Sequence, residues 1–327
     1  MSIATEASPV LSEGTVPSPA VAPGVPAAAS SAGASAKKTF GPAFWVATVW
    51  LTVVVFCAIV GKILPFVKDT PDYLAAAEVA EGRWTGVVSM SHPLATDAQG
   101  NDILSSLIVG SRNSIIISFA TIFLGFVVGG MFGMIAGYRK GRFDAVVSFF
   151  ITILLSIPPL LFILLMISVI SAGGGENGVD QGLQTSVWKL AMSLGVLSIP
   201  SLFRIVRGAT MSFAGREFVV AARAMGAKTG RILFREIFPN VAKPMLAYGL
   251  VAAGNVMVIE GGLSFLGVGV NGPAWGRMIN SGSSLSDLRL APHVAFIPAL
   301  VLFLTVLSFN FVGDKVRERL EVKEGNI

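Results

Sequence analysis

The chain has 327 residues, of which 53% are hydrophobic and only 13% are charged. Soluble domains carry about 25% charged residues, so this composition excludes an ordinary water-soluble protein and predicts a surface that faces lipid. The net charge of +5 would also suit nucleic acid, but the positions of the charges favour a membrane protein, and no nucleic-acid partner is predicted. The single cysteine, Cys57, excludes an intrachain disulfide and a cysteine metal site.

The N-terminal segment 1–41 is rich in Ala, Pro, Ser and Gly. It lacks an apolar run that could form a core, so it is predicted to be a disordered cytoplasmic tail. A signal peptide would place a basic patch and a short apolar stretch close to Met1, and neither is there. The first apolar segment follows Lys37 and Lys38 and is long enough to span a bilayer, so it is predicted to remain as an anchor.

A hydrocarbon core about 30 Å thick requires roughly 20 helical residues, and several segments of the chain reach that length. The predicted spans are 42–64, 114–137, 145–171, 187–206, 244–263 and 293–312. Pro200 interrupts the fourth span, and Pro158 with Pro159 is predicted to kink the third, because proline lacks the backbone N–H that a helix needs. The sequence therefore predicts an all-α polytopic membrane protein with six transmembrane helices.

The basic residues are distributed unevenly between the gaps. Seventeen of the 24 lysines and arginines fall on one side: sixteen lie before the first span, between spans two and three, between spans four and five, or after the sixth, and Arg204 lies at the end of the fourth span. The positive-inside rule then predicts that both termini are cytoplasmic, the C-terminal tail being 313–327. Three long polar segments remain: 65–113 and 264–292 outside, and 207–243 inside. The predicted core transmembrane domain is 114–312, and it contains the inner loop 207–243. Loops longer than about 15 residues usually carry function or are disordered.

The inner loop contains the stretch 216–240, which predicts two short helices joined by a glycine turn. Apolar residues at the spacing of one helical face are Phe218, Ala221, Ala222 and Met225. Gly226 is predicted to end the first helix in the left-handed conformation. Thr229 is predicted to cap the second helix and Pro239 to end it.

These two helices would form a compact knob that another protein could contact. Ala221 and Ala222 lack bulk, so a partner's backbone could approach them closely. The alternative is a basic loop that lies on anionic lipid. A lipid-binding helix would need more aromatic residues and leucines on its buried face, so contact with a protein is the favoured interpretation.

The knob resembles the "EAA" loop of binding-protein-dependent ATP-binding-cassette (ABC) importers. That pattern has Ala-Ala, three further residues, Gly, and Ile-x-Pro about a dozen residues later, and Ala221, Ala222, Gly226, Ile237 and Pro239 match it in spacing. Val220 and Phe238 depart from it, since they replace the usual acid and leucine. The resemblance implies that the following residues couple the chain to an ATPase: Arg216, Glu217, Ala221, Ala222, Arg223, Gly226, Ala227, Lys228, Thr229, Ile237 and Pro239.

Three further segments are similar to one branch of that family, the permeases of the DppC/OppC type that carry dipeptides, oligopeptides or nickel. HPLATDAQGNDILSSLIVGSRNS at 92–114 resembles the pattern HPLGTDxxGRDVLSRLxxGxRxS, from which Ala95 and Asn101 depart. EGGLSFLGVGVNGPAWGRMI at 260–279 and LTVLSFNFVGDKVRERLE at 304–321 resemble its later motifs. The four motifs occur in the same order as in the family.

The resemblance implies the fold of a type I ABC importer permease with cytoplasmic coupling helices, in the bacterial inner membrane. It implies a heterodimer with a homologous permease, two ATPase subunits that hold ATP and Mg²⁺, and an extracytoplasmic solute-binding protein that delivers peptide. The chain itself has no GxxxxGK[ST] phosphate loop, so neither ATP hydrolysis nor a bound cofactor is predicted for it. Nickel chelates, haem and glutathione are carried by close relatives and stay open as alternative cargo.

The two predicted outer segments and the end of span five supply candidate residues for an external loop or gate. They are His92, Asp97, Asp102, Glu260, Ser264, Phe265 and Trp275. With only two histidines in the chain, a metal site is not favoured, and Asp97 is predicted to hydrogen-bond its local backbone in a turn. Glu260 lies near the end of span five, where a charge is costly, so it is predicted either to hydrogen-bond the glycine-rich loop that follows or to contact substrate.

Span two carries a glycine at every fourth position, at Gly125, Gly129, Gly133 and Gly137. Such a ladder predicts a helix-packing surface, either within the chain or against a partner. Two other classes of membrane protein are the alternatives. An ion-coupled secondary transporter would need carboxylates at mid-membrane and inverted repeats, and a membrane enzyme or scaffold would need a catalytic constellation or a large folded domain. The sequence favours neither class.

Overall fold

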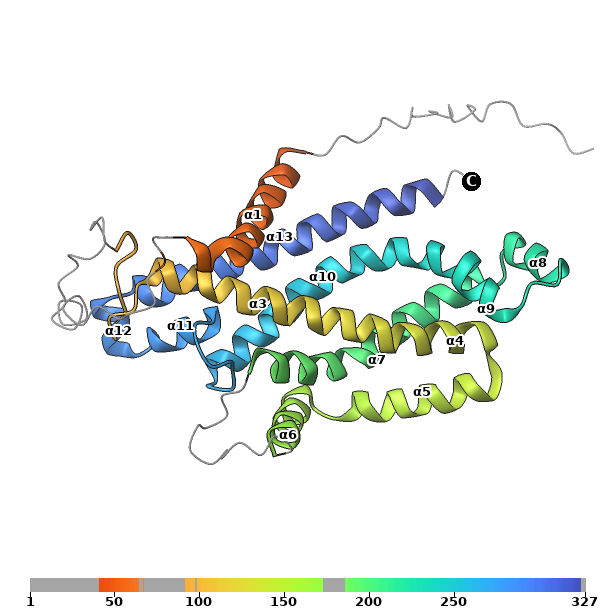
Figure 1. Ribbon diagram of the computed structural model, residues 1–327, viewed down its shortest axis with the longest axis horizontal. Helices are drawn as coiled ribbons and strands as arrows, with labels where there is room; N and C mark the ends of the chain where they lie inside the picture. The colour runs from red at the N-terminus through yellow and green to blue at the C-terminus, as the bar shows by residue number, and fades with distance from the viewer. Residues whose placement is uncertain (1–40, 65–66, 68–91, 98, 173–185, 325–327) are drawn as a thin grey trace, which may run out of the picture. The chain divides into compact units, whose positions relative to one another are not determined.

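The computed structural model describes residues 41–64, 67, 92–97, 99–172 and 186–324 (Figure 1). Nearly all of the predicted tail 1–41, most of 65–91 and residues 325–327 lie outside this part of the chain, and the predictions made for them stay predictions. All described residues belong to one compact unit, Phe40–Ile327.

The described chain is helical, and it includes an isolated β-bridge between Thr96 and Asp102. The elements are α1 Pro42–Val60, η1 Gly61–Ile63, α3 Ile103–Gly125, η3 Phe126–Gly130, α4 Met131–Arg139, α5 Gly141–Ser156, α6 Pro159–Ala172, α7 Val187–Phe213, α8 Glu217–Ala224, α9 Thr229–Arg231, η4 Ile232–Ile237, α10 Phe238–Phe265, α11 Trp275–Ser281, α12 Leu285–Leu290 and α13 His293–Glu324. Of these, η3 and η4 are π-helical turns and η1 is a 3₁₀ turn. The predicted all-α class is confirmed.

Five helices are long and apolar enough to cross a membrane, and α5 with α6 makes a sixth if this bent pair counts as one span. The second span begins at Ile103 rather than at residue 114. The carboxylate of Asp102 accepts the backbone N–H of Ser105 at 2.8 Å and so caps the helix earlier than hydropathy suggested. From there the helix runs without a break through η3 to Arg139.

Prolines affect the other spans in different ways. The predicted break at Pro158 and Pro159 is confirmed, since α5 and α6 meet at 96°. Pro200, by contrast, lies inside α7, which continues to Phe213. Pro244 lies inside a helix that runs over Thr229–Phe265, so the fifth span begins well before its predicted start.

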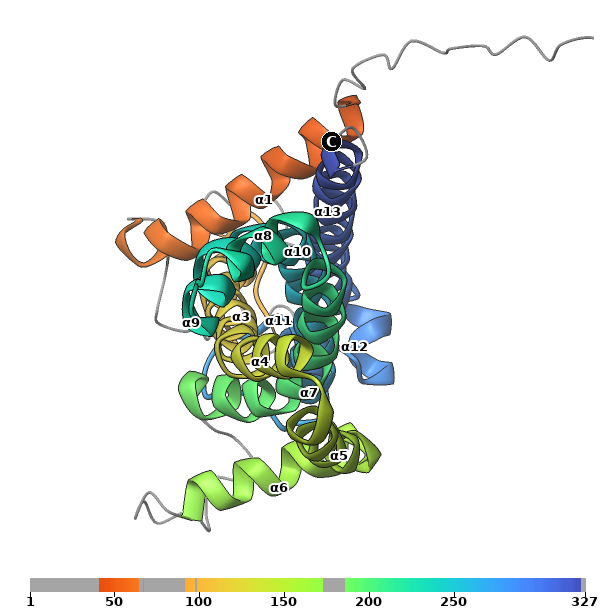
Figure 2. The same cartoon turned by 90° about the vertical axis from the view of Figure 1, so that its right-hand side faces the viewer.

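The long helices lie side by side, with α8 and α9 at one end of the molecule and α11 and α12 at the other (Figures 1 and 2). We call these the α8 end and the α11 end. Each end has its own buried cluster. Trp275, Ile103 and Leu190 belong to the cluster at the α11 end, and Val219 and Ile237 to the one at the α8 end. The sixth span, α13, extends past its predicted end at residue 312, so most of the segment predicted as a C-terminal tail is helical.

The glycine ladder packs against α7. A Cβ added at Gly133 would lie 2.7 Å from the carbonyl oxygen of Phe203, and one at Gly129 would lie 2.5 Å from that of Ile199. Gly137 meets the carbonyl oxygen of Arg207 in the same way. We call this contact the glycine seam; its members on the long helix are Gly125, Gly129, Gly133 and Gly137. The ladder is therefore a packing surface within the chain, where the sequence had left a partner as the alternative.

Candidate functional site: a coupling segment and two grooves

The first helix of the predicted knob is α8, and it ends as the sequence predicted. Gly226 has φ +79°, and its N–H bonds the carbonyl of Arg223 while the next N–H, of Ala227, bonds that of Ala222. These two bonds form a Schellman motif, in which a glycine in the left-handed conformation closes the helix and satisfies its last carbonyls. The turn thus fixes the direction in which the chain leaves α8.

The second helix of the knob differs from its prediction. Lys228, not Thr229, is the N-cap of α9, and no side chain caps that helix. Pro239 does not end it either, because this proline is the second residue of α10, which follows the π-helical turn η4 without a break. A π turn changes the hydrogen-bond register where the proline N–H is missing, and the side-chain amide of Asn240 donates to the carbonyl of Glu236 at 2.7 Å. The knob is therefore continuous with the fifth span.

The residues of α8 that pack against the chain's own core differ from the apolar face predicted for it, of which only Ala222 is buried. Val219 and Ala222 are buried, together with Ile232, Leu233 and Ile237 of η4. Ala222 is therefore closed to a partner's backbone, contrary to the expectation for the Ala-Ala pair, because it faces the cluster at the α8 end. Ala221 stays exposed.

α8 and its C-cap expose apolar residues beside the charged Glu217 and Arg223. Val220 is 55% exposed and Met225 is 82% exposed, and Phe218 is partly exposed beside them. A glycine-closed helix that buries one apolar face and leaves another in the open has the form of a protein contact. The residues that the sequence predicted for coupling do not include Val220. Its exposure could not be predicted, because the pattern does not tell which residues of α8 are buried.

The two arginines predicted to couple the chain lie against its own rings. The guanidinium of Arg216 is 5.1 Å from the ring centre of Phe213, and that of Arg223 is 5.5 Å from the ring centre of Tyr138. Arg223 also donates to the Tyr138 hydroxyl at 3.3 Å. Such cation–π contacts hold the knob to α7 and α4. Glu217, Lys228 and Thr229 are exposed and Ala227 is half-buried.

An ion pair ties α5 to α7 near the same end. The guanidinium of Arg207 binds the carboxylate of Asp144 in a bidentate manner, with the Nη2–Oδ2 distance at 2.6 Å, and Ser148 donates to the same carboxylate. Arg207 also belongs to the glycine seam, where its carbonyl faces Gly137. Bidentate pairs are geometrically specific, so this contact fixes where α5 sits on the seam.

At the α11 end, the predicted turn around Asp97 is present. Its carboxylate accepts the backbone N–H groups of Gln99 and Asn101 at 2.9 and 2.8 Å, and the Asn101 amide at 2.9 Å. His92 and Asp102 are buried and 3.1 Å apart. In the described part of the chain, no group of three His, Cys, Asp or Glu side chains could hold a metal ion.

The candidates predicted as one gate are divided by the structure. Glu260 is fully buried and accepts hydrogen bonds from Ser264 at 2.8 Å and from Ser114 at 3.0 Å. Trp275 is also buried and donates its indole N–H to the carbonyl of Leu107 at 3.0 Å. These contacts join α10, α3 and α11, which is a structural role. Phe265, by contrast, is exposed.

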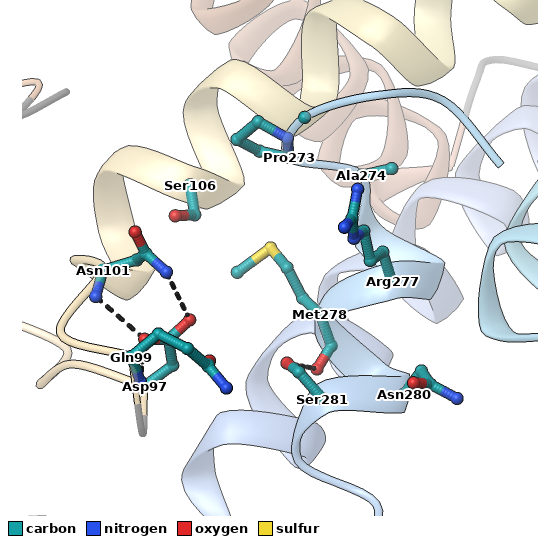
Figure 3. Close-up of a pocket in the computed structure, with 11 residues that line it drawn as sticks. Asp97, Gln99, Asn101, Ser106, Pro273, Ala274, Arg277, Met278, Asn280 and Ser281 are labelled. Atoms are coloured by element: carbon teal, nitrogen blue, oxygen red, sulfur yellow. Dashed lines mark hydrogen bonds between the residues drawn. The ribbon is translucent and has the colours of Figure 1, made fainter. Parts of the chain in front are cut away.

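Two grooves open on the surface of the described chain. The polar groove, of about 750 Å³, lies at the α11 end between the Asp97 turn and α11 (Figure 3). The apolar groove, of about 400 Å³, lies between the long helix Ile103–Arg139 and the segment η4–α10. Its lining residues are Phe123, Phe126, Val127, Gly130, Met131, Met134, Val206, Phe234, Phe238, Val241, Ala242, Met245 and Leu246.

Comparison with known proteins identifies the family. Residues 129–323 match the profile of the binding-protein-dependent transport system inner membrane component. The chain belongs to this family. The match covers the glycine seam from Gly129 onward, the coupling segment and nearly all of α13. Membership makes the chain a multi-pass permease subunit of an ABC importer, which works with ATPase subunits and a partner permease.

Relatives of this permease extend the similarity beyond the family profile. This permease is 30% identical to the oligopeptide transport system permease protein OppC of Haemophilus influenzae, over 83% of this chain and 81% of the relative. It is 32% identical to the glutathione transport system permease protein GsiD of Pectobacterium atrosepticum, over 72% of the chain and 74% of the relative. An inward-facing structure of the MetNI methionine ABC transporter matches with a TM-score of 0.54 at 20% identity, over 66% of the permease and 96% of that chain. The fold is that of type I ABC importer permeases.

Proposed function

We propose that this permease carries di- and oligopeptides into the cytoplasm of a bacterium. The names of relatives support peptide as the cargo, since they include an oligopeptide permease and a putative peptide permease of Brucella suis. The uneven distribution of basic residues supports an orientation with both termini, and the α8 end, in the cytoplasm.

The working complex that we propose has four kinds of component. This permease pairs with a homologous permease, two ATPase subunits bind ATP and Mg²⁺, and an extracytoplasmic solute-binding protein delivers peptide. The family description, a binding-protein-dependent transport component, supports the external partner.

The observation that carries the proposal is the set of exposed apolar residues on and just after α8. Phe218, Val220 and Met225 are exposed, while Val219 and Ala222 of the same helix are fixed in the chain's own core. Exposed apolar residues on a rigid support are typical of the centre of a protein interface. We infer that an ATPase subunit covers them.

Force would pass from α8 into the membrane part through side-chain packing. Val219 and Ala222 pack with residues of η4, and η4 continues into α10. Phe213, at the end of α7, belongs to the same cluster. A shift of α8 is therefore passed through η4 to α10. ATP biases transport only if the ATPase contacts α8 differently in its two states.

The test is a charge placed on the proposed contact. Met225→Asp is expected to lower the affinity for the ATPase subunits about 30-fold or more, the loss of a hot spot worth about 2 kcal/mol, and to stop ATP-dependent peptide uptake. Gly215→Asp is the matched control, because it adds the same charge to the same end where a Cβ meets nothing within 4 Å. The readouts are co-purification and uptake into proteoliposomes. If Met225→Asp co-purifies with the ATPase subunits and takes up peptide as the wild type does, the coupling role is contradicted.

Glutathione is the second candidate cargo, which the name of one relative favours. Uptake of a labelled tripeptide and of labelled glutathione by the same proteoliposomes separates the two. We expect the peptide to be carried and glutathione to compete weakly. Uptake that persists without ATP and follows an ion gradient would instead favour a secondary transporter.

A further inference from the structure

The apolar groove lies between two helices that are long and apolar enough to cross a membrane, Ile103–Arg139 and Thr229–Phe265. All of the described residues that line it have apolar side chains. Phe123, Phe234 and Leu246 among them are exposed, so the groove is open on the surface of the described chain. An apolar surface of this kind marks a contact with a membrane, a ligand or another protein.

The dimensions of the groove match one hydrocarbon chain. Its lining on the long helix runs from Phe123 to Met134, which is about 16 Å and so roughly half of a hydrocarbon core about 30 Å thick. A volume of about 400 Å³ over that length gives a mean cross-section of about 25 Å², which is a width of about 5 Å. A helix with its side chains is about 10–12 Å across. The groove is therefore too narrow for a helix of a partner, and it has the depth of one lipid leaflet.

A peptide does not suit the groove either. The side chains that line it offer no N–H group, no O–H group and no oxygen atom. Backbone N–H and C=O groups that are buried without a hydrogen bond are costly, whereas a hydrocarbon chain has no such groups to satisfy. The lining therefore favours an acyl chain over the cargo.

The η4–α10 wall carries positive charge at the α8 end. Arg231 and Arg235 are exposed, and each stands three residues before a phenylalanine of the groove wall, Phe234 and Phe238 respectively. Residues at this spacing are neighbours on the surface of a helix. Glu236 is two residues from each phenylalanine, a spacing at which side chains do not face each other, so its carboxylate lies on the other side. The mouth of the groove is thus basic.

The other wall also ends beside a cation. Tyr138 lies one turn beyond Met134, and the guanidinium of Arg223 is 5.5 Å from its ring centre. Lys243 is a further exposed cation, next to Ala242 of the groove wall. Clusters of basic residues at the membrane surface attract anionic lipid headgroups, and a guanidinium is a good hydrogen-bond donor to phosphate.

We propose that the apolar groove binds an anionic phospholipid, with one acyl chain between its walls and the phosphate at the arginines of the α8 end. This inference goes beyond the proposed function and does not depend on the cargo. The walls belong to the long helix and to η4–α10, so a bound chain holds these segments apart. The lipid therefore favours the state of the permease in which the groove is open.

The experiment uses the complete transporter, with both permeases and the ATPase pair, in nanodiscs of equal parts phosphatidylglycerol and phosphatidylcholine. One lipid at a time carries a photoreactive group at the end of an acyl chain, and mass spectrometry measures the label on the groove walls and on α1. The exposed apolar side chains of α1 do not line the groove, so this helix reports the bulk lipid. We expect phosphatidylglycerol to label the walls about fivefold or more over phosphatidylcholine, and α1 equally. Equal labelling of the walls by the two lipids would overturn the proposal.

Arginine variants test the headgroup site. Arg231→Gln combined with Arg235→Gln should reduce the preference for phosphatidylglycerol about threefold or more. The matched control is Arg139→Gln combined with Arg142→Gln, which removes two exposed arginines beside the turn between α4 and α5 and should leave the preference unchanged. A preference that falls equally in both double variants would show a general effect of charge and overturn the assignment to the groove.

A second pair of variants tests the acyl-chain site. Val127→Trp fills the groove without a change of charge and should remove most of the label from the η4–α10 wall, whereas Val53→Trp on α1 should not. A photoreactive residue at Leu246 that crosslinks to the partner permease or to labelled peptide, in place of lipid, would overturn the proposal. Peptide uptake is measured on the same preparations. If uptake fails while the lipid labels as expected, only the proposed function fails, because labelling does not require transport.

Discussion

On one face of the long helix Ile103–Arg139, glycines lie against the backbone of α7, whereas the opposite face opens onto the apolar groove. The seam has no room for a single added carbon, since a Cβ at Gly133 would lie 2.7 Å from a carbonyl oxygen. On the groove side, a Cβ at Gly130 would meet nothing closer than 3.8 Å. Phe123 and Phe234 are exposed there. One helix thus has a closed face and an open one.

The difference indicates which parts of the permease move together. Helices in backbone contact over several turns cannot shift without a clash, so α7 and the long helix form one rigid body. The apolar groove has a π-helical turn in each wall, η3 in one and η4 in the other. Such turns often occur at functional sites, and they bend helices. We therefore expect α10 to move against α3 and α4 across this groove when α8 is displaced.

The largest expected effect comes from a methyl group added to the seam. Gly133→Ala should lower the free energy of unfolding by about 1–3 kcal/mol, because the carbonyl of Phe203 must give way. Gly130→Ala, one turn away on the open side, should be neutral or stabilise by up to about 1 kcal/mol through helix propensity. Thermal unfolding in detergent measures both. Equal losses in the two variants would show that the two faces are not packed differently.

A loss of similar size is expected where α5 is attached to the seam. Arg207→Gln leaves the partly buried carboxylate of Asp144 without its cation and should cost about 1–3 kcal/mol. Adding Asp144→Asn removes that charge and should restore part of the loss. A double-mutant cycle from the same unfolding data gives the coupling energy of the pair. If the free energy of unfolding of the double variant falls by the sum of the decreases in the two single variants, the ion pair does not hold α5.

The smallest effect is expected at the α11 end, where Ala95 has φ +65°. An L-residue in this region costs roughly 1–2 kcal/mol, which glycine avoids, so the Gly that the related permeases usually carry here has a physical reason. Ala95→Gly should raise the stability by about 1 kcal/mol at most, since it also removes a buried methyl group. Ala274→Gly is the control, a buried alanine with φ −145°, and it should destabilise. A loss of stability of similar size in Ala95→Gly and Ala274→Gly would exclude strain at Ala95.

Periodicity and hydropathy predicted the helical class and the approximate centres of the spans, because apolar length is a strong local signal. The ends of the spans were predicted poorly. The cap at Asp102 and the π turn before Pro239 depend on side-chain contacts that hydropathy does not see. Gly226 was predicted correctly, since a left-handed helix end has a local residue signature.

The rest of the site depended on tertiary contacts. The sequence predicted that the glycine ladder packs but not that it packs on α7. The apolar periodicity of α8 did not reveal that Val219 and Ala222 face inward, because both faces of that helix are apolar. Neither groove could be predicted, since each is formed by segments far apart in the chain.

Electron paramagnetic resonance distances test the central claim, that force entering at α8 moves α10 across the apolar groove while the seam stays closed. In the complete transporter with Cys57→Ser, one pair of spin labels replaces Met131 and Phe234 on the two walls of the groove. A second pair replaces the exposed residues Phe132 and Arg204 on the two sides of the seam. Between the nucleotide-free and ATP-trapped states, we predict a change of several ångströms in the first distance and none in the second. A constant groove distance, or a change across the seam alone, would contradict the account.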